Sequence, residues 1–125
     1  MARFTAQELQ AIGGADELQV SSRRFNGTMR PAVTIWGVRV GDDLYIRSAH
    51  GAENGWFRRA VGSGHGQVRA GGLIKRVAFE RVVDEAVNER IDAEYHRKYD
   101  RYGARIVGTV VGPGVHDVTL RLLPE

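Results

Sequence analysis

The dipeptide Asn26-Gly27 separates two stretches of the chain that read as β-strands. An Asn-Gly pair in this setting is the strongest short-range signal for a β-hairpin, because both residues tolerate the positive φ of a tight turn. The first stretch, residues 18–23, alternates in polarity, and the second, residues 32–40, is rich in β-branched and aromatic side chains. The dipeptide therefore predicts antiparallel pairing early in the chain.

The rest of the chain continues this pattern of short strands and tight turns. Further strands are predicted at residues 44–48, 67–70, 73–83 and 118–122. Helices are predicted over residues 6–12, behind a Thr5-to-Glu8 capping box, over residues 56–61 and over residues 85–102. Short loops and antiparallel neighbours favour a mainly β, α+β barrel over a doubly wound sheet. We expect residues 1–125 to form a single domain.

Composition excludes several functional classes. The chain is 42% hydrophobic and 26% charged, which is typical of a folded protein rather than a disordered one. It contains no cysteine, which excludes disulfides, thiolate metal sites and cysteine nucleophiles. Its four histidines lie far apart without ligand spacing, so no metal site is expected. Because we find neither a signal peptide nor an apolar segment of bilayer length, we expect a cytoplasmic protein without a membrane partner.

Basic residues are concentrated in the middle of the chain. Residues 23–81 hold eleven Lys or Arg against four Asp or Glu, and sixteen of the eighteen basic residues overall are arginine. Arginine suits bidentate recognition of phosphate and carboxylate, which predicts an anionic small-molecule ligand or substrate. A genome rich in G and C would also enrich arginine, and the sequence leaves both explanations open.

The stretch 46–60, IRSAHGAENGWFRRA, leaves a strand, crosses a loop and enters a helix. It could form a cradle for a phosphate or cofactor, or a solvated corner with a buried tryptophan. Strand alternation places Ser48 on the core side, so Arg47 points the other way. Either the loop at residues 49–55 offers backbone amides to a ligand, or Arg47 faces solvent. Trp56 is interpreted as a packed anchor rather than a catalytic residue.

Other candidate motifs are weaker. The glycine-rich residues 62–66 precede no helix, so a turn is favoured over a phosphate loop. Ser48 and His50 lack the GxSxG elbow of hydrolases. Aromatic residues on basic strands could stack nucleic-acid bases, but the pattern of a nucleic-acid-binding module is missing, so a nucleic-acid partner is not expected. The stripe of Tyr95, Tyr99 and Tyr102 favours core packing over hydroxyls at a pocket edge.

Three segments carry a resemblance to known proteins. Residues 22–36, SRRFNGTMRPAVTIW, resemble the GRxSGxxRxxP hairpin of deazaflavin-dependent nitroreductase-like proteins. Residues 41–51 resemble their DGDxYxVxAS strand and loop, and residues 56–60 resemble their WxxNL helix. The whole chain is more similar to an uncharacterised bacterial family beside them in the FMN- and deazaflavin-binding split-barrel superfamily, which includes pyridoxamine-phosphate oxidases. The resemblance implies a six-stranded split β-barrel with packed helices.

The resemblance also implies a function and a site. The function is a flavin- or deazaflavin-dependent oxidoreductase, nitroreductase-like, with FMN or a deazaflavin as cofactor and possible homodimers. The cofactor-binding positions carried over are Arg30, Thr34, Trp36, Arg47, Ser48, Ala49, His50 and Trp56, with Arg58 and Arg59 as weaker additions. In this scheme Arg30 and Arg47 hold phosphate, and either tryptophan shields the ring.

This chain departs from the motifs at two places. The hairpin lacks the Ser-Gly pair, and Arg58-Arg59 replaces the Asn-Leu pair. A second hypothesis therefore stays open, namely a cofactor-free split barrel that binds or transforms an anionic small molecule in a biosynthetic pathway. Neither hypothesis identifies catalytic residues.

Overall fold

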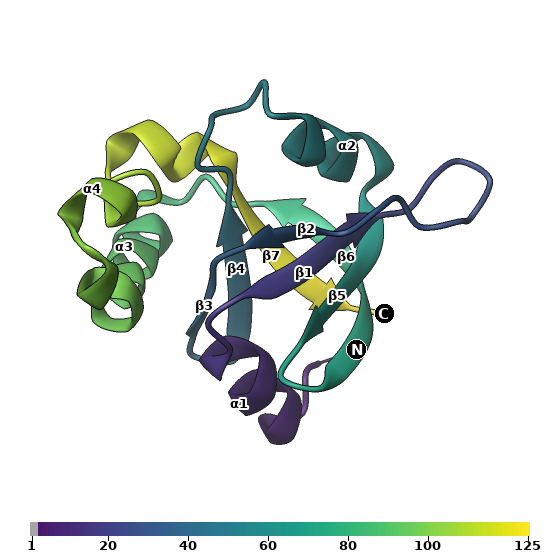
Figure 1. Ribbon diagram of the computed structural model, residues 1–125, viewed down its shortest axis with the longest axis horizontal. Coiled ribbons are helices and arrows are strands. Elements are labelled where there is room, and N and C mark those ends of the chain that lie inside the picture. The colour runs from purple at the N-terminus through teal and green to yellow at the C-terminus, as the bar shows by residue number, and fades with distance from the viewer. Residues whose placement is uncertain (1–2) are drawn as a thin grey trace.

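A computed structural model describes residues 3–125 and contains one seven-stranded antiparallel sheet (Figure 1). The strands are β1 (Leu18–Ser22), β2 (Val33–Ile35), β3 (Gly37–Val40), β4 (Asp43–Arg47), β5 (His65–Ala70), β6 (Leu73–Arg81) and β7 (Thr119–Pro124). The helices are α1 (Ala6–Gly14), α2 (Gly55–Ser63), α3 (Glu85–Tyr99) and α4 (Ala104–Val107), with 3₁₀ turns η1 (Asp100–Tyr102) and η2 (Pro113–Val118). Each predicted strand and helix is present, with ends that shift by a few residues.

The sheet curls into a nearly closed barrel, in the order β2-β1-β5-β6-β7-β4-β3. Its two edges, β2 and β3, are consecutive in the chain, and only Trp36 separates them. The predicted single strand over residues 32–40 is thus two strands, which raises the predicted six strands to seven. The strand bends because its first half pairs with β1, Val33 opposite Val20, whereas its second half pairs with β4, Val38 opposite Tyr45.

Gly37 permits this bend. A β-carbon there would come within 2.8 Å of a Leu18 methyl carbon and 3.2 Å of the Tyr45 carbonyl oxygen. Only a residue without a side chain lets β3 approach its neighbours this closely. The split in the barrel therefore has a local cause in the sequence.

Helices α1 and α2 lie at opposite ends of the barrel (Figure 1). The capping box that begins α1 is present, since the Thr5 hydroxyl accepts from the amide of Glu8 at 3.1 Å and the Glu8 carboxylate accepts from the amide of Thr5 at 2.8 Å. Side chains from both helices, among them Ile12 and Phe57, join the apolar interior formed by the strands. The main core therefore lies inside the barrel.

Helix α3 packs on the outside of β3 and forms a second core. Asp84 caps this helix by accepting from the amide of Val87 at 3.0 Å. Tyr95 and Tyr99 are fully buried, which confirms the predicted packing role of this helix face. Tyr102 lies beyond the helix in η1 and is 43% exposed. No helix was predicted within residues 104–118, whereas the structure forms α4 and η2 in this segment.

No helix within residues 3–125 has both the length and the apolar character that a membrane-crossing segment requires.

Candidate functional site

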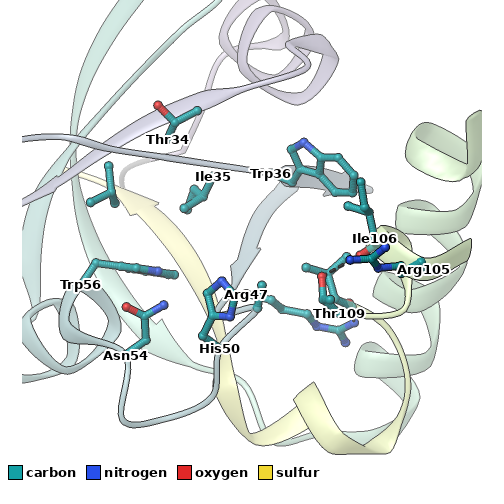
Figure 2. Close-up of a pocket in the computed structure, with 13 residues that line it drawn as sticks. Thr34, Ile35, Trp36, Arg47, His50, Asn54, Trp56, Arg105, Ile106 and Thr109 are labelled. Carbon is teal, nitrogen blue, oxygen red and sulfur yellow. Dashed lines mark hydrogen bonds between the residues drawn. The ribbon is translucent and has the colours of Figure 1, made fainter. Parts of the chain in front are cut away.

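A pocket of about 500 Å³ opens where the barrel is split (Figure 2). Residues 33–36 form one wall, the end of β4 and the following loop form the floor, and α2 and α4 contribute the remaining sides. We call it the tryptophan pocket, because both tryptophans of the chain line it. Its volume lies in the range typical of sites for small molecules and cofactors.

The two tryptophans, Trp36 and Trp56, lie at opposite ends of the pocket (Figure 2). Trp36 stacks on Tyr99 with ring centroids 4.1 Å apart and planes 7° apart, and its carbonyl accepts a hydrogen bond from the Tyr95 hydroxyl at 3.2 Å. Trp56 packs edge-on against buried Phe57 at 5.9 Å. Each indole is therefore held by aromatic packing from behind while it lines the pocket.

Arg47 lies at the base of the pocket with its side chain fully buried. Its Nε donates to the Thr119 hydroxyl at 2.9 Å. One terminal nitrogen donates to the carbonyl and the side-chain oxygen of Asn88 at 3.1 and 2.9 Å. The other donates to the Val110 carbonyl at 2.8 Å and forms an ion pair with Asp92. Because a guanidinium has five N–H donors, each one is occupied.

These bonds correct two expectations about Arg47. The side chain does not face solvent, because α3 and the segment after α4 enclose it. Nor does it have a free N–H for the phosphate that the resemblance assigned to it. Its function in this structure is to attach α3 and the α4 wall to the barrel. The strand alternation is correct, since Arg47 points away from the interior, but α3 covers that outer face as well.

Ser48 is also unavailable to a ligand. It is fully buried, and its hydroxyl donates to the Gly51 carbonyl at 2.7 Å, while its amide donates to the Val118 carbonyl at 3.2 Å. These bonds shape the loop that follows β4. Ser48 therefore supports the pocket from below and does not line it.

The network around Arg47 extends to His116 in η2. Its Nδ1 lies 2.6 Å from a Glu85 oxygen and its Nε2 lies 2.9 Å from an Asp92 oxygen. Burial alone would lower the pKa of His116, but the hydrogen bonds to Asp92 and Glu85 outweigh it and raise that pKa. Burial would likewise raise the pKa of Asp92, and the hydrogen bonds from His116 and Arg47 reverse this and lower it. The geometry thus favours an imidazolium bridging two carboxylates.

Five of the predicted positions besides Arg47 line the tryptophan pocket, namely Thr34, Trp36, Ala49, His50 and Trp56. Arg30 and Arg59 instead line a separate pocket on the other side of Trp56. Arg58 is exposed and lines neither pocket. The structure therefore divides the predicted site into an apolar pocket and a group of arginines beside it.

Sequence reasoning missed the α4 wall, where Arg105, Ile106 and Thr109 line the pocket. This helix has only four residues, too few for a recognisable periodicity. Sequence reasoning also passed over Asn54, which occupies the N-cap of α2 but makes no capping bond with its side chain. An N-cap asparagine that leaves the cap unused has an amide available for a ligand, although the sequence alone does not show this.

Among the pocket's side chains, His50 and Asn54 are the polar groups that can serve a ligand directly. Within residues 3–125 neither side chain makes a hydrogen bond to the protein, and Figure 2 shows Asn54 beside Trp56 and His50 between Trp56 and Arg47. Together they offer amide and imidazole groups that can donate and accept. Arg105 adds an exposed cation at the edge.

A family model described as "Uncharacterized protein conserved in bacteria (DUF2255)" matches residues 8–122. No protein with a curated description matches the sequence. Among solved structures, one similar chain is assigned as a pyridoxamine 5'-phosphate oxidase from Listeria innocua, with TM-score 0.62, 18% identity, and coverage of 88% of this chain and 84% of the other.

Two further solved structures share the fold. One is assigned as a 5-nitroimidazole antibiotic resistance protein from Bacteroides thetaiotaomicron, with TM-score 0.64, 15% identity, and coverage of 100% of this chain and 82% of the other. The other is an F420 reductase, with TM-score 0.55, 16% identity, and coverage of 93% of this chain and 91% of the other. At these identities the likeness concerns the fold. It confirms the split barrel predicted from the sequence.

Proposed function

The chain belongs to the bacterial family DUF2255, and we propose that it binds a flavin or deazaflavin in the tryptophan pocket and acts as an oxidoreductase on a small molecule. The observation that carries the proposal is a pocket of about 500 Å³ that has an indole at each end and is also lined by two polar side chains, His50 and Asn54, without hydrogen bonds to the described residues. A flat heterocycle with hydrogen-bonding edges matches this arrangement, because indoles offer apolar surface while amide and imidazole groups fix orientation.

The residues of the pocket fit such a ring. Tyr99 is stacked against the indole of Trp36, and Tyr95 bonds to the backbone carbonyl of the same residue, so both the ring and its backbone have packed partners. Asn54 and His50 would hold the polar edge of the ring. Ile35 and Ile106 would exclude water from the opposite side. Arg47 would act indirectly, by fixing the α4 wall through its bond to Val110.

A bound flavin or deazaflavin would supply hydride transfer, and the protein would supply binding, orientation and exclusion of water. Structural neighbours named as a pyridoxamine 5'-phosphate oxidase and an F420 reductase support this choice of cofactor class. The neighbour named as a 5-nitroimidazole resistance protein supports a small-molecule substrate. We extend the proposal to a cytoplasmic protein and, following the resemblance, to a homodimer.

Titration with riboflavin, FMN and a deazaflavin tests the proposal. Both tryptophans line the pocket and the chain has no others, so binding of a ring should quench tryptophan emission and shift the absorption of the ligand. Ile106→Trp, followed by the absorption of the ligand because the variant adds a third tryptophan, should weaken binding at least tenfold, since this exposed residue lines the pocket. Ile74→Trp is the matched control, since Ile74 is also exposed but lies on β6 outside the pocket.

Failure of all three ligands to alter emission or absorption at high micromolar concentrations would reject the proposal. A thermal-shift screen against anionic metabolites would then test the cofactor-free alternative, because a bound ligand raises the melting temperature by mass action. Arg105 is the exposed cation that such a metabolite would meet in the pocket.

A further inference from the structure

Three aromatic rings lie in contact between the wall of the tryptophan pocket and the protein surface. Trp36 lines the pocket (Figure 2), and Tyr99, at the end of α3, stacks on its indole with ring centroids 4.1 Å apart. Tyr102, in η1, has its ring centroid 5.4 Å from that of Trp36 and 6.3 Å from that of Tyr99. Tyr99 is fully buried, whereas Tyr102 is 43% exposed. The indole in the pocket is therefore next to a ring that meets solvent.

This arrangement is suited to the movement of single electrons. Electron transfer is fast between rings in van der Waals contact, because electronic coupling falls steeply with distance. Indole and phenol are the aromatic side chains that lose one electron most readily, and the chain has no cysteine thiol to compete with them. A one-electron vacancy created on Trp36 thus has phenol rings beside it that can fill it.

The hydroxyl of Tyr102 has a base in place for its proton. A phenol gives up an electron readily only when its proton passes to a base, and the Tyr102 hydroxyl donates a hydrogen bond to the carboxylate of Asp16. Arg101 pairs with the same carboxylate and donates to the Tyr102 oxygen at 3.1 Å. The hydrogen bonds from Tyr102 and Arg101 lower the pKa of Asp16. An oxidised phenol is nevertheless a far stronger acid than a carboxylic acid, so its proton still passes to Asp16.

The buried tyrosines of α3 have no such base. The Tyr95 hydroxyl donates to a backbone carbonyl at 3.2 Å, and the Tyr99 hydroxyl donates to two backbone carbonyls at 2.8 and 3.1 Å. A carbonyl accepts a hydrogen bond but is too weak a base to keep a proton, and burial raises the pKa of both phenols. Within residues 3–125, Tyr102 is the only tyrosine whose hydroxyl is bonded to a carboxylate. Tyr102 is therefore the ring on which the vacancy would come to rest.

We propose that Trp36 and Tyr102 form a redox route that carries an oxidising equivalent from the tryptophan pocket to the protein surface. A one-electron oxidant of the radical class takes one electron from the Trp36 indole. The indole radical cation then takes one electron from Tyr102, and the phenolic proton moves to Asp16. The oxidant is thus reduced by one electron, Trp36 is restored, and Tyr102 becomes a neutral phenoxyl radical. A soluble reductant such as a thiolate returns the electron at the exposed ring, and Asp16 returns the proton.

Pulse radiolysis with the azide radical tests this route. The azide radical takes one electron from indole in preference to phenol and leaves as azide ion. The measurement is made on the full chain carrying Trp56→Phe, so that Trp36 is its only indole. We expect the absorption of the indole radical to decay while that of the phenoxyl radical rises at the same rate. The process should be first-order and independent of protein concentration, because both rings belong to one molecule.

Three variants in this background identify the route. Tyr102→Phe should slow the decay about tenfold or more, because the hydroxyl of the remaining neighbour, Tyr99, has no carboxylate to take its proton. Asp16→Asn should also slow it about tenfold or more, because an amide is not a base. Tyr45→Phe is the matched control, since Tyr45 makes no ring contact with Trp36 within residues 3–125, and it should change the rate less than twofold.

Three results would overturn the proposal. The first is decay of the indole radical without a phenoxyl signal, or at a rate proportional to protein concentration. The second is a rate in Tyr102→Phe equal to that in Tyr45→Phe, which would place the vacancy on another ring. The third is an unchanged rate in Asp16→Asn, which would remove the proton acceptor on which the route depends. No flavin is present in these measurements, so a failed flavin titration leaves this test intact.

Discussion

The ion pair between Arg47 and Asp92 should contribute strongly to stability. Asp92→Asn removes one negative charge and keeps the shape of the side chain. The side chain of Arg47 is fully buried and that of Asp92 is 21% exposed, so the substitution leaves the guanidinium charge without its partner in the interior. Removal of one partner from a buried pair costs about 3–5 kcal/mol. The partial exposure of Asp92 and the neutral acceptors that Arg47 keeps place the expected loss at about 3 kcal/mol.

Urea denaturation measures this loss. For a chain of this length, about 3 kcal/mol lowers the melting temperature by about 10 °C. Asp43→Asn is the control, because Asp43 pairs with Arg121 at 3.7 Å with side chains 41% and 33% exposed. An exposed pair of this kind contributes up to about 1 kcal/mol. If Asp92→Asn costs no more than Asp43→Asn, the Arg47 network does not hold α3 and the α4 wall to the barrel.

Three further predictions concern other parts of the structure. The pKa of His116 is raised in the folded protein, so its protonation stabilises the fold fully below about pH 6.5, and this contribution is lost as pH rises through the pKa of the folded state. The urea midpoint of the wild type should therefore fall with increasing pH, whereas that of His116→Gln should stay level. Gly66→Ala should destabilise the protein by about 3 kcal/mol, measured by urea denaturation, because a β-carbon would lie 2.0 Å from the Ser21 carbonyl oxygen. Tyr99→Phe should lower the free energy of unfolding by about 1–2 kcal/mol, since the hydroxyl bonds the Asp16 carbonyl at 2.8 Å and the Gly37 amide at 3.2 Å. A wild type whose stability is flat with pH, or variants as stable as the wild type, would contradict these expectations.

Local signals in the sequence were sufficient for most of the fold. The Asn26-Gly27 turn, the Thr5 capping box and the apolar face of α3 each depend on residues close together in the chain, and each is present in the structure. The division of the strand at Trp36 depends on its pairing with both β1 and β4. That pairing joins distant segments, and no local pattern specifies it.

The site was predictable as a region but not in its details. The sequence brought attention to Trp36, His50 and Trp56, which the fold gathers in one pocket. It could not show that Asn88 and Asp92, more than forty positions away, occupy the guanidinium of Arg47. Whether an arginine is free depends on its partners in space, and those partners come from another layer of the fold.

The link between β2 and β3 is a single residue, and its length also affects the size of the pocket. Both edges of the sheet meet at Trp36, and the strands there pair with different neighbours. An insertion at this point would widen the mouth of the pocket and leave the register of each ladder unchanged. Chain length at one position can therefore adjust the size of ligand that the barrel accepts, independently of the residues that stabilise it.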